Sequence, residues 1–134
     1  MIEDKTGKKS YLGIIVNYDK EKTLGKFSID TLKDRYFWEK ETYAQEAFAR
    51  ASVFSATYKG ETDYELAQRL YNYSSDCWFM FSTPILSNGG TTRGLPISCF
   101  LNYVPDSRSG LSNHYDENIW LASSGGGIGG YWGD

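Results

Sequence analysis

The chain has 134 residues, which suits one small domain or one part of a larger one. Its 14 basic and 17 acidic side chains give a net charge of −3 without a basic stripe, which argues against a nucleic-acid partner. Free nucleotides are not excluded, because backbone amides can bind phosphate without any net positive charge.

The cysteine content and the apolar runs indicate the compartment. Two cysteines, Cys77 and Cys99, do not make a disulfide framework, so a reducing cytoplasm is expected. No apolar run is long enough to span a bilayer, and the start of the chain has no signal-peptide pattern. We therefore expect a cytoplasmic location.

The first forty residues carry two weak signals. Residues 11–18 (YLGIIVNY) are rich in β-forming side chains and predict a short strand, although no partner strand is obvious. Residues 28–39 predict a helix or a turn-rich segment.

Two stronger helical patterns follow. Thr42 and Gln45 have the spacing of a capping box, and apolar residues then recur on one helical face as far as Phe54. Residues 62–65 repeat the capping pattern, and an apolar stripe continues through Cys77 to Phe81. With Gly60 in the turn between them, these segments predict a helical hairpin.

The residue pattern changes at Pro84, because all three prolines of the chain lie between residues 84 and 105. Asn88-Gly-Gly predicts a loop, and residues 97–104 predict a buried strand. A turn with Asp106, Ser107 or Ser109 as the cap leads into a helix with Leu111, Tyr115, Ile119 and Ala122 on one face. The glycine run 125–130 comes last, so strand, helix and loop make half of an α/β repeat.

Cys99 has two possible readings. A single cysteine in a β-rich run is usually a small buried hydrophobe, but its reactivity would allow a chemical role. Ser98 points to the opposite face of a regular strand unless a bulge brings both side chains toward one site. Cys77, on an apolar helical face, is expected to be structural.

The remaining polar motifs are also ambiguous. The glycine run suits either a flexible turn or close approach to a phosphate or sugar. Asp106 and the serines after it suit simple capping or contact with a ribose and phosphate. His114, the only histidine, is expected at a surface or an interface. Asp116 and Glu117 are adjacent and do not share a helical face.

Several of these motifs, in this order and spacing, resemble the catalytic large subunit of class I ribonucleotide reductases. They are STPILSNGG (82–90), RGLPISC (93–99), VPDS (104–107), ENIWLA (117–122) and the glycine run. Residues 34–37 (DRYF) and the helix from Glu41 are similar to the segment before the catalytic barrel, though less specifically.

The resemblance implies radical replacement of the ribose 2′-hydroxyl by hydrogen. Cys99 matches one cysteine of the redox pair that reduces the substrate. Thr83, Ser98, Gly126 and Gly127 match substrate-binding positions. Asp106 and Ser107 match the start of the allosteric specificity site, where a deoxynucleoside triphosphate binds at the dimer contact, and the helix at 109–123 matches one in that interface.

The resemblance also implies an α/β fold with an N-terminal helical segment (1–80) and the first strand-helix-loop unit (81–134) of a ten-stranded barrel. The other catalytic cysteines, the active-site Asn and Glu and the radical-path tyrosines have no counterpart in the sequence. We therefore expect the N-terminal part of a divided or truncated subunit, inactive alone.

The implied partners follow from that expectation. They are the rest of the large subunit, a second large subunit, a metal-containing small subunit that supplies the radical, and thioredoxin or glutaredoxin. A ribonucleoside diphosphate is the implied substrate, dNTP or ATP the effector, and this chain itself binds no metal or other cofactor. The alternatives are a non-catalytic interaction module or orphan remnant, and a stand-alone nucleotide-binding domain that uses the glycine run.

Overall fold

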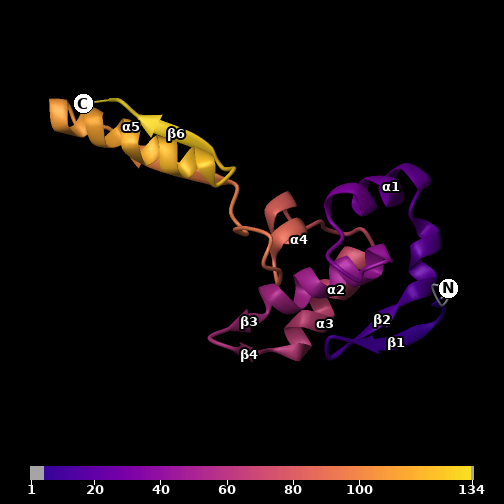
Figure 1. Cartoon of the computed structure of the whole chain (residues 1–134). Helices are drawn as coiled ribbons and strands as arrows, with labels where there is room; N and C mark the ends of the chain where they lie inside the picture. Colours follow the sequence, from indigo (N-terminus) through magenta and orange to yellow (C-terminus); the bar gives the residue numbers. More distant parts are fainter. Residues whose placement is uncertain (1–4, 134) are drawn as a thin grey trace. The chain divides into compact units, whose positions relative to one another are not determined.

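The computed structural model describes residues 5–133. The chain divides into two compact units, Met1–Pro96 and Ile97–Asp134, and each is described by itself. Figure 1 shows the elements in chain order. The boundary lies later than the one expected between residues 80 and 81, because residues after 81 pack into the first unit.

The first unit begins with an antiparallel hairpin of β1 (Lys8–Tyr11) and β2 (Ile14–Asn17). Leu12 and Gly13 both have positive φ, as a two-residue hairpin turn requires. Ile14 and Val16 point into the core while Ile15 is exposed, which is the alternation of a half-buried strand. The single strand predicted at 11–18 is therefore shorter, Ile14–Asn17, because Leu12 and Gly13 form the turn and Tyr11 ends the partner strand β1.

The 3-10 helix η1 (Tyr18–Thr23) and α1 (Lys26–Arg35) come next. The segment predicted at 28–39 is therefore helical only as far as Arg35. The helix α2 (Ala44–Ser55) lies at the centre of the core, and its alanines are fully buried. Its cap differs from the expected Thr42–Gln45 box. The carboxylate of Glu46 instead accepts hydrogen bonds from the backbone amides of Thr42 and Tyr43.

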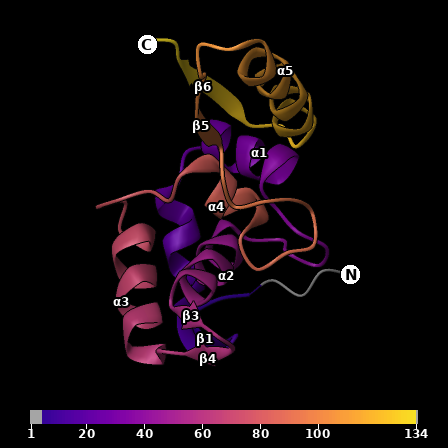
Figure 2. The same ribbon diagram turned by 90° about the vertical axis from the view of Figure 1, so that its left-hand side faces the viewer.

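Helix α3 (Tyr64–Ser75) packs along α2, as Figure 2 shows, which confirms the predicted helical hairpin. A small hairpin of β3 (Thr57–Tyr58) and β4 (Glu61–Thr62) connects the two helices, with Gly60 in its turn at φ +86°. The side chain of Asp63 caps α3 by accepting from the amide of Leu66. The expected continuation to Phe81 was wrong, because Cys77 adopts φ +59° and ends the helical path.

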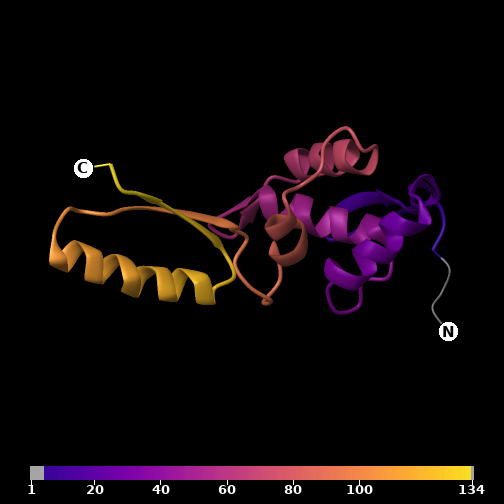
Figure 3. The same cartoon turned by 90° about the horizontal axis from the view of Figure 1, so that it is seen from above.

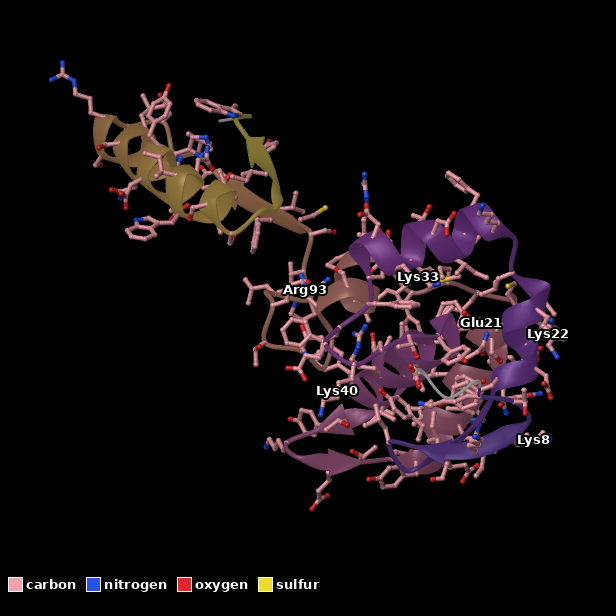
Figure 4. All side chains as sticks on the ribbon, turned by 45° about the vertical axis from the view of Figure 1, so that its right-hand side comes forward. Lys8, Glu21, Lys22, Lys33, Lys40 and Arg93 are labelled. Atoms are coloured by element: carbon pink, nitrogen blue, oxygen red, sulfur yellow. The ribbon has the colours of Figure 1, made fainter. Side chains whose placement is uncertain are left out.

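Helix α4 (Thr83–Asn88) belongs to the first unit. The buried guanidinium of Arg50 donates to the carbonyl oxygens of Leu86, Gly89 and Tyr36, and it forms a 2.6 Å salt bridge with Glu41. Arg93, labelled in Figure 4, donates to the carbonyls of Arg35 and Phe37. These contacts place residues up to Pro96 with the helices.

The second unit consists of β5 (Cys99–Tyr103), α5 (Arg108–Ser123) and β6 (Gly127–Tyr131). The two strands are parallel and α5 runs alongside them, as Figure 3 shows. The helix is confirmed. The strand expected at 97–104 is present, but it is largely exposed within this unit rather than buried, with Leu101 89% exposed. Most of the expected glycine loop is also a strand. The unit is thus a strand-helix-strand repeat rather than half of one, and the chain has the mixed helix and strand content that was expected.

Among residues 5–133, no helix is long and apolar enough to cross a membrane.

Candidate functional site

Ser98 and Cys99 mark the start of β5. Both side chains are exposed, and the Ser98 Oγ lies 3.5 Å from the Cys99 Sγ. The two groups therefore face the same space, which is the arrangement that a regular strand would not give. Because the thiol is free and accessible, Cys99 is not a small buried hydrophobe, which was one of its two possible interpretations.

Gly126 and Gly127 lie beside this pair. Cys99 is in register with Gly127, whose backbone amide donates a 2.7 Å hydrogen bond to the carbonyl of Ser98. A Cβ at Gly126 would collide with the ring of Phe100, so this position requires glycine. A Cβ at Gly127 would lie 3.6 Å from the Ser98 oxygen, an ordinary contact. Four of the five expected catalytic and substrate-binding residues thus meet at one end of the second unit.

Thr83, the fifth, belongs to the first unit. It is the first residue of α4, followed by Pro84, and its exposed hydroxyl lies 3.3 Å from the hydroxyl of Tyr36. Thr83 therefore belongs to a different unit from the other four residues.

Asp106 and Ser107 follow the carboxyl end of β5, opposite the end that carries Cys99. The Ser107 hydroxyl caps α5 by accepting from the amide of Gly110, which confirms one of the predicted caps. Asp106 precedes this cap and is exposed. The first-turn amides of α5 that side chains do not satisfy can bind an anion.

The apolar side of α5 does not face the strands of its own unit. The apolar stripe with Leu111, Tyr115 and Ile119 is exposed, and Ile119 retains 69% of its accessible surface. The strand-facing side instead carries Gly110, His114 and Asn118. A strand-helix repeat normally buries the apolar side of its helix, so this stripe is a surface available to another protein.

His114 was expected at a surface or an interface, but only 5% of it is exposed within its own unit. Its Nε2 pairs with the Asn118 amide at 2.9 Å, and its ring packs edge-on against Trp132. The sequence signal that would have revealed this face is the series of small or polar residues at 110, 114 and 118, one helical turn apart.

Cys77 was expected to be a structural residue on an apolar helical face. It instead lies beyond the end of α3 and is exposed, with a free thiol. It borders an apolar groove of about 320 Å³ in the first unit, together with side chains from α1, α2 and α4. Within the described residues, no group of three or more His, Cys, Asp or Glu side chains lies together in a way that could hold a metal ion.

The chain is similar to known ribonucleotide reductases along most of its length. Residues 22–94, more than half of the chain, match the family described as ribonucleotide reductase, all-alpha domain. The ribonucleoside-diphosphate reductase large subunits of two viruses are similar over 87% of the chain. That of invertebrate iridescent virus 6 is 37% identical and that of invertebrate iridescent virus 3 is 40% identical.

A solved structure gives the same result for the fold. The alpha subunit of the Actinobacillus ureae class Id ribonucleotide reductase superposes with a TM-score of 0.68 at 34% identity, covering 83% of this chain. The chain spans 12% and 18% of the lengths of the two viral relatives and 21% of the solved structure. With its motifs, its fold and these similarities in agreement, the chain belongs to the ribonucleotide reductase large-subunit family.

Proposed function

We propose that this chain takes part, as one section of a ribonucleoside-diphosphate reductase large subunit, in reducing ribonucleotides to deoxyribonucleotides. The observation that supports this most is the meeting of Ser98, Cys99, Gly126 and Gly127 at one end of a parallel strand pair. A thiol, a hydroxyl and two residues without side chains there leave room for a sugar to approach.

Cys99 is proposed to be half of the reducing dithiol. Replacing the ribose 2′-hydroxyl by hydrogen consumes two electrons and releases water, and two thiols supply the electrons by forming a disulfide. The second thiol is proposed to come from the rest of the large subunit, because the resemblance assigns the partner cysteine to a motif that this sequence does not contain. Thioredoxin or glutaredoxin would then reduce the disulfide.

The other residues are proposed to hold the substrate, a ribonucleoside diphosphate. Ser98 would bind the ribose or phosphate through its hydroxyl, and Gly126 and Gly127 would pass close to the sugar. Thr83 is proposed as a further substrate contact on the resemblance of its motif, since it belongs to the first unit.

Asp106 and Ser107 are proposed to bind the dNTP or ATP effector with the first turn of α5. The exposed stripe of α5 is proposed to contact a second large subunit, because an uncovered apolar face is typical of an interface. The radical would come from a metal-containing small subunit, in the cytoplasm, and the barrel that these elements begin would be completed by the rest of the subunit.

The test is co-expression of this chain with the remainder of a reductase large subunit and the small subunit, followed by an assay of diphosphate reduction. Cys99→Ser is expected to abolish turnover with dithiol reductants, while Cys77→Ser, the matched control, retains it. Full activity of Cys99→Ser would overturn the dithiol role. Absence of reductase activity in every assembled combination would overturn the proposed function itself.

A further inference from the structure

The strand-facing side of α5 carries a chain of hydrogen bonds between polar side chains. The Asn102 Nδ2, on β5, donates to the Asn118 Oδ1 at 2.9 Å. The Asn118 Nδ2 then pairs with the Nε2 of His114 at 2.9 Å. Because an amide nitrogen can only donate, Nε2 accepts, and the neutral ring carries its proton on Nδ1. The series Asn102–Asn118–His114 is called the polar latch below.

The latch lies between α5 and the strands, where apolar side chains usually pack. His114 is buried, and the Asn102 Oδ1 and His114 Nδ1 are buried atoms without a protein partner among the described residues. Burying a polar atom without a hydrogen-bond partner costs free energy. Favourable packing alone therefore does not explain why these polar residues occupy the interior. Directional hydrogen bonds, unlike apolar contacts, fix one register between a helix and a strand.

The Asn102 Oδ1 and the imidazole of His114 lie beside Gly130 of β6. A Cβ at Gly130 would lie 2.9 Å from the Trp132 Nε1, 3.1 Å from the His114 Cε1 and 3.4 Å from the Asn102 Oδ1. Only a residue without a side chain fits at Gly130, so β6 packs closely against His114 and Asn102. The latch therefore touches both strands as well as the helix.

We propose that Asn102, Asn118 and His114 are positioning residues that hold β5, with the Ser98–Cys99 pair at its start, in one register against α5. Asn102 is three residues from Cys99 on the same strand, and His114 is two helical turns from the Ser107 cap. The latch thus joins the strand that begins with the thiol to the helix that begins at the proposed effector residues. The proposal rests on the proposed function only for what Cys99 does.

The test uses the full chain labelled with ¹⁵N, in which His114 is the only histidine, so its imidazole signals need no assignment. The latch is expected to give the spectrum of a neutral ring protonated on Nδ1, with Nε2 accepting a hydrogen bond. Asn118→Leu, which keeps the size of the side chain, removes this signature and speeds hydrogen exchange of the β5 amides roughly tenfold. Asn113→Leu, the same change at an exposed position of α5, leaves both unchanged.

Asn118→Asp separates positioning from packing. A carboxylate can only accept, so the proton is expected to move to Nε2 while protection of β5 returns toward that of the unaltered chain. If Asn118 only filled space beside His114 without a hydrogen bond to Nε2, the carboxylate would not move the proton. An unaltered His114 spectrum in Asn118→Leu, or equal exchange rates in Asn118→Leu and Asn113→Leu, would overturn the latch. Neither result depends on reductase turnover, so failure of the proposed function stays distinguishable.

Discussion

The backbone amide of Gly127 donates a 2.7 Å hydrogen bond to the carbonyl oxygen of Ser98, the residue before the exposed thiol of Cys99. This bond begins the pairing of two parallel strands whose connecting helix covers 16 residues. The residues with the proposed chemistry are therefore neighbours in space through β5 and β6, although almost thirty positions separate them in sequence.

Alanine substitutions at Gly126 and Gly127 are expected to affect stability and substrate binding differently. Gly126→Ala is expected to destabilise the second unit by about 1–3 kcal/mol, because the new methyl group would overlap the ring of Phe100. Gly127→Ala meets only an ordinary contact and is expected to leave stability nearly unchanged. On the proposed function, however, it blocks the sugar.

Hydrogen exchange of β5 and β6 measures the first effect, and the KM for the diphosphate in the assembled reductase measures the second. Equal loss of protection in both variants would contradict the packing argument. An unchanged KM in Gly127→Ala would contradict a close approach of the sugar at that residue.

Arg50 tests the core of the first unit. Its guanidinium and the Glu41 carboxylate are almost fully buried, and it donates to three backbone carbonyls around α4. Arg50→Met is expected to lower the free energy of unfolding by about 3–5 kcal/mol, because it leaves Glu41 charged and unpaired in the interior. Arg35→Met, at an exposed pair with Asp34, is the matched control and costs at most about 1 kcal/mol. Urea denaturation compares them, and similar midpoints would contradict a structural role for Arg50.

The sequence predicted what depends on local periodicity. The pattern of apolar residues from 42 to 75 and the Ser107 cap lie within a few turns of chain, and both were confirmed. The end of α3 was missed because it depends on the backbone of Cys77, whose positive φ no side-chain pattern reports. The first hairpin turn is not evident from the sequence for the same reason, because Leu12 adopts a positive φ that its side chain does not indicate.

The glycine run predicts a loop rather than a strand for a related reason. Glycines carry no side chains that could alternate between two faces, so β6 is determined by pairing with β5, which is distant in sequence. The apolar stripe of α5 predicts the helix correctly, but its spacing alone does not show which side the strands cover. In this unit the strands pack against His114 and Asn118, so the stripe stays exposed.

Two carboxyl groups, the buried Glu46 and the half-buried Glu21, predict opposite dependences of stability on pH. Burial raises the pKa of Glu46, but the Lys5 ammonium, the Thr42 amide and the Tyr18 hydroxyl outweigh it and lower the pKa below the ordinary 4.5. A carboxyl whose pKa falls on folding stabilises the protein above the unfolded pKa and loses that contribution as pH falls through the folded value. The free energy of unfolding is therefore expected to decrease below about pH 4.5 because of Glu46, and Glu46→Gln flattens this decrease.

Glu21 has the opposite sign. Burial raises the pKa of this carboxyl, although it accepts hydrogen bonds from the amides of Ala44 and Gln45. The folded protein therefore binds this proton more tightly than the unfolded chain does. Its titration adds stability as pH falls, and Glu21→Gln is expected to make the acid loss steeper. Urea denaturation at several pH values measures both slopes. Two variants with the same slope would show that these groups do not control the acid limb.

The exposed stripe of α5 predicts self-association in the assembled large subunit. Ile119→Asp places a charge at the centre of the stripe and is expected to weaken a dimer at least about tenfold, because burying an unpaired carboxylate costs well over 1.4 kcal/mol. Asp116→Asn, on the same helix, removes an exposed charge and serves as the control. Sedimentation equilibrium measures the dissociation constant of each. If Ile119→Asp dimerises as tightly as the unaltered subunit, the stripe faces something other than a second copy, and the rest of the same subunit is then the surface to test by hydrogen exchange of α5.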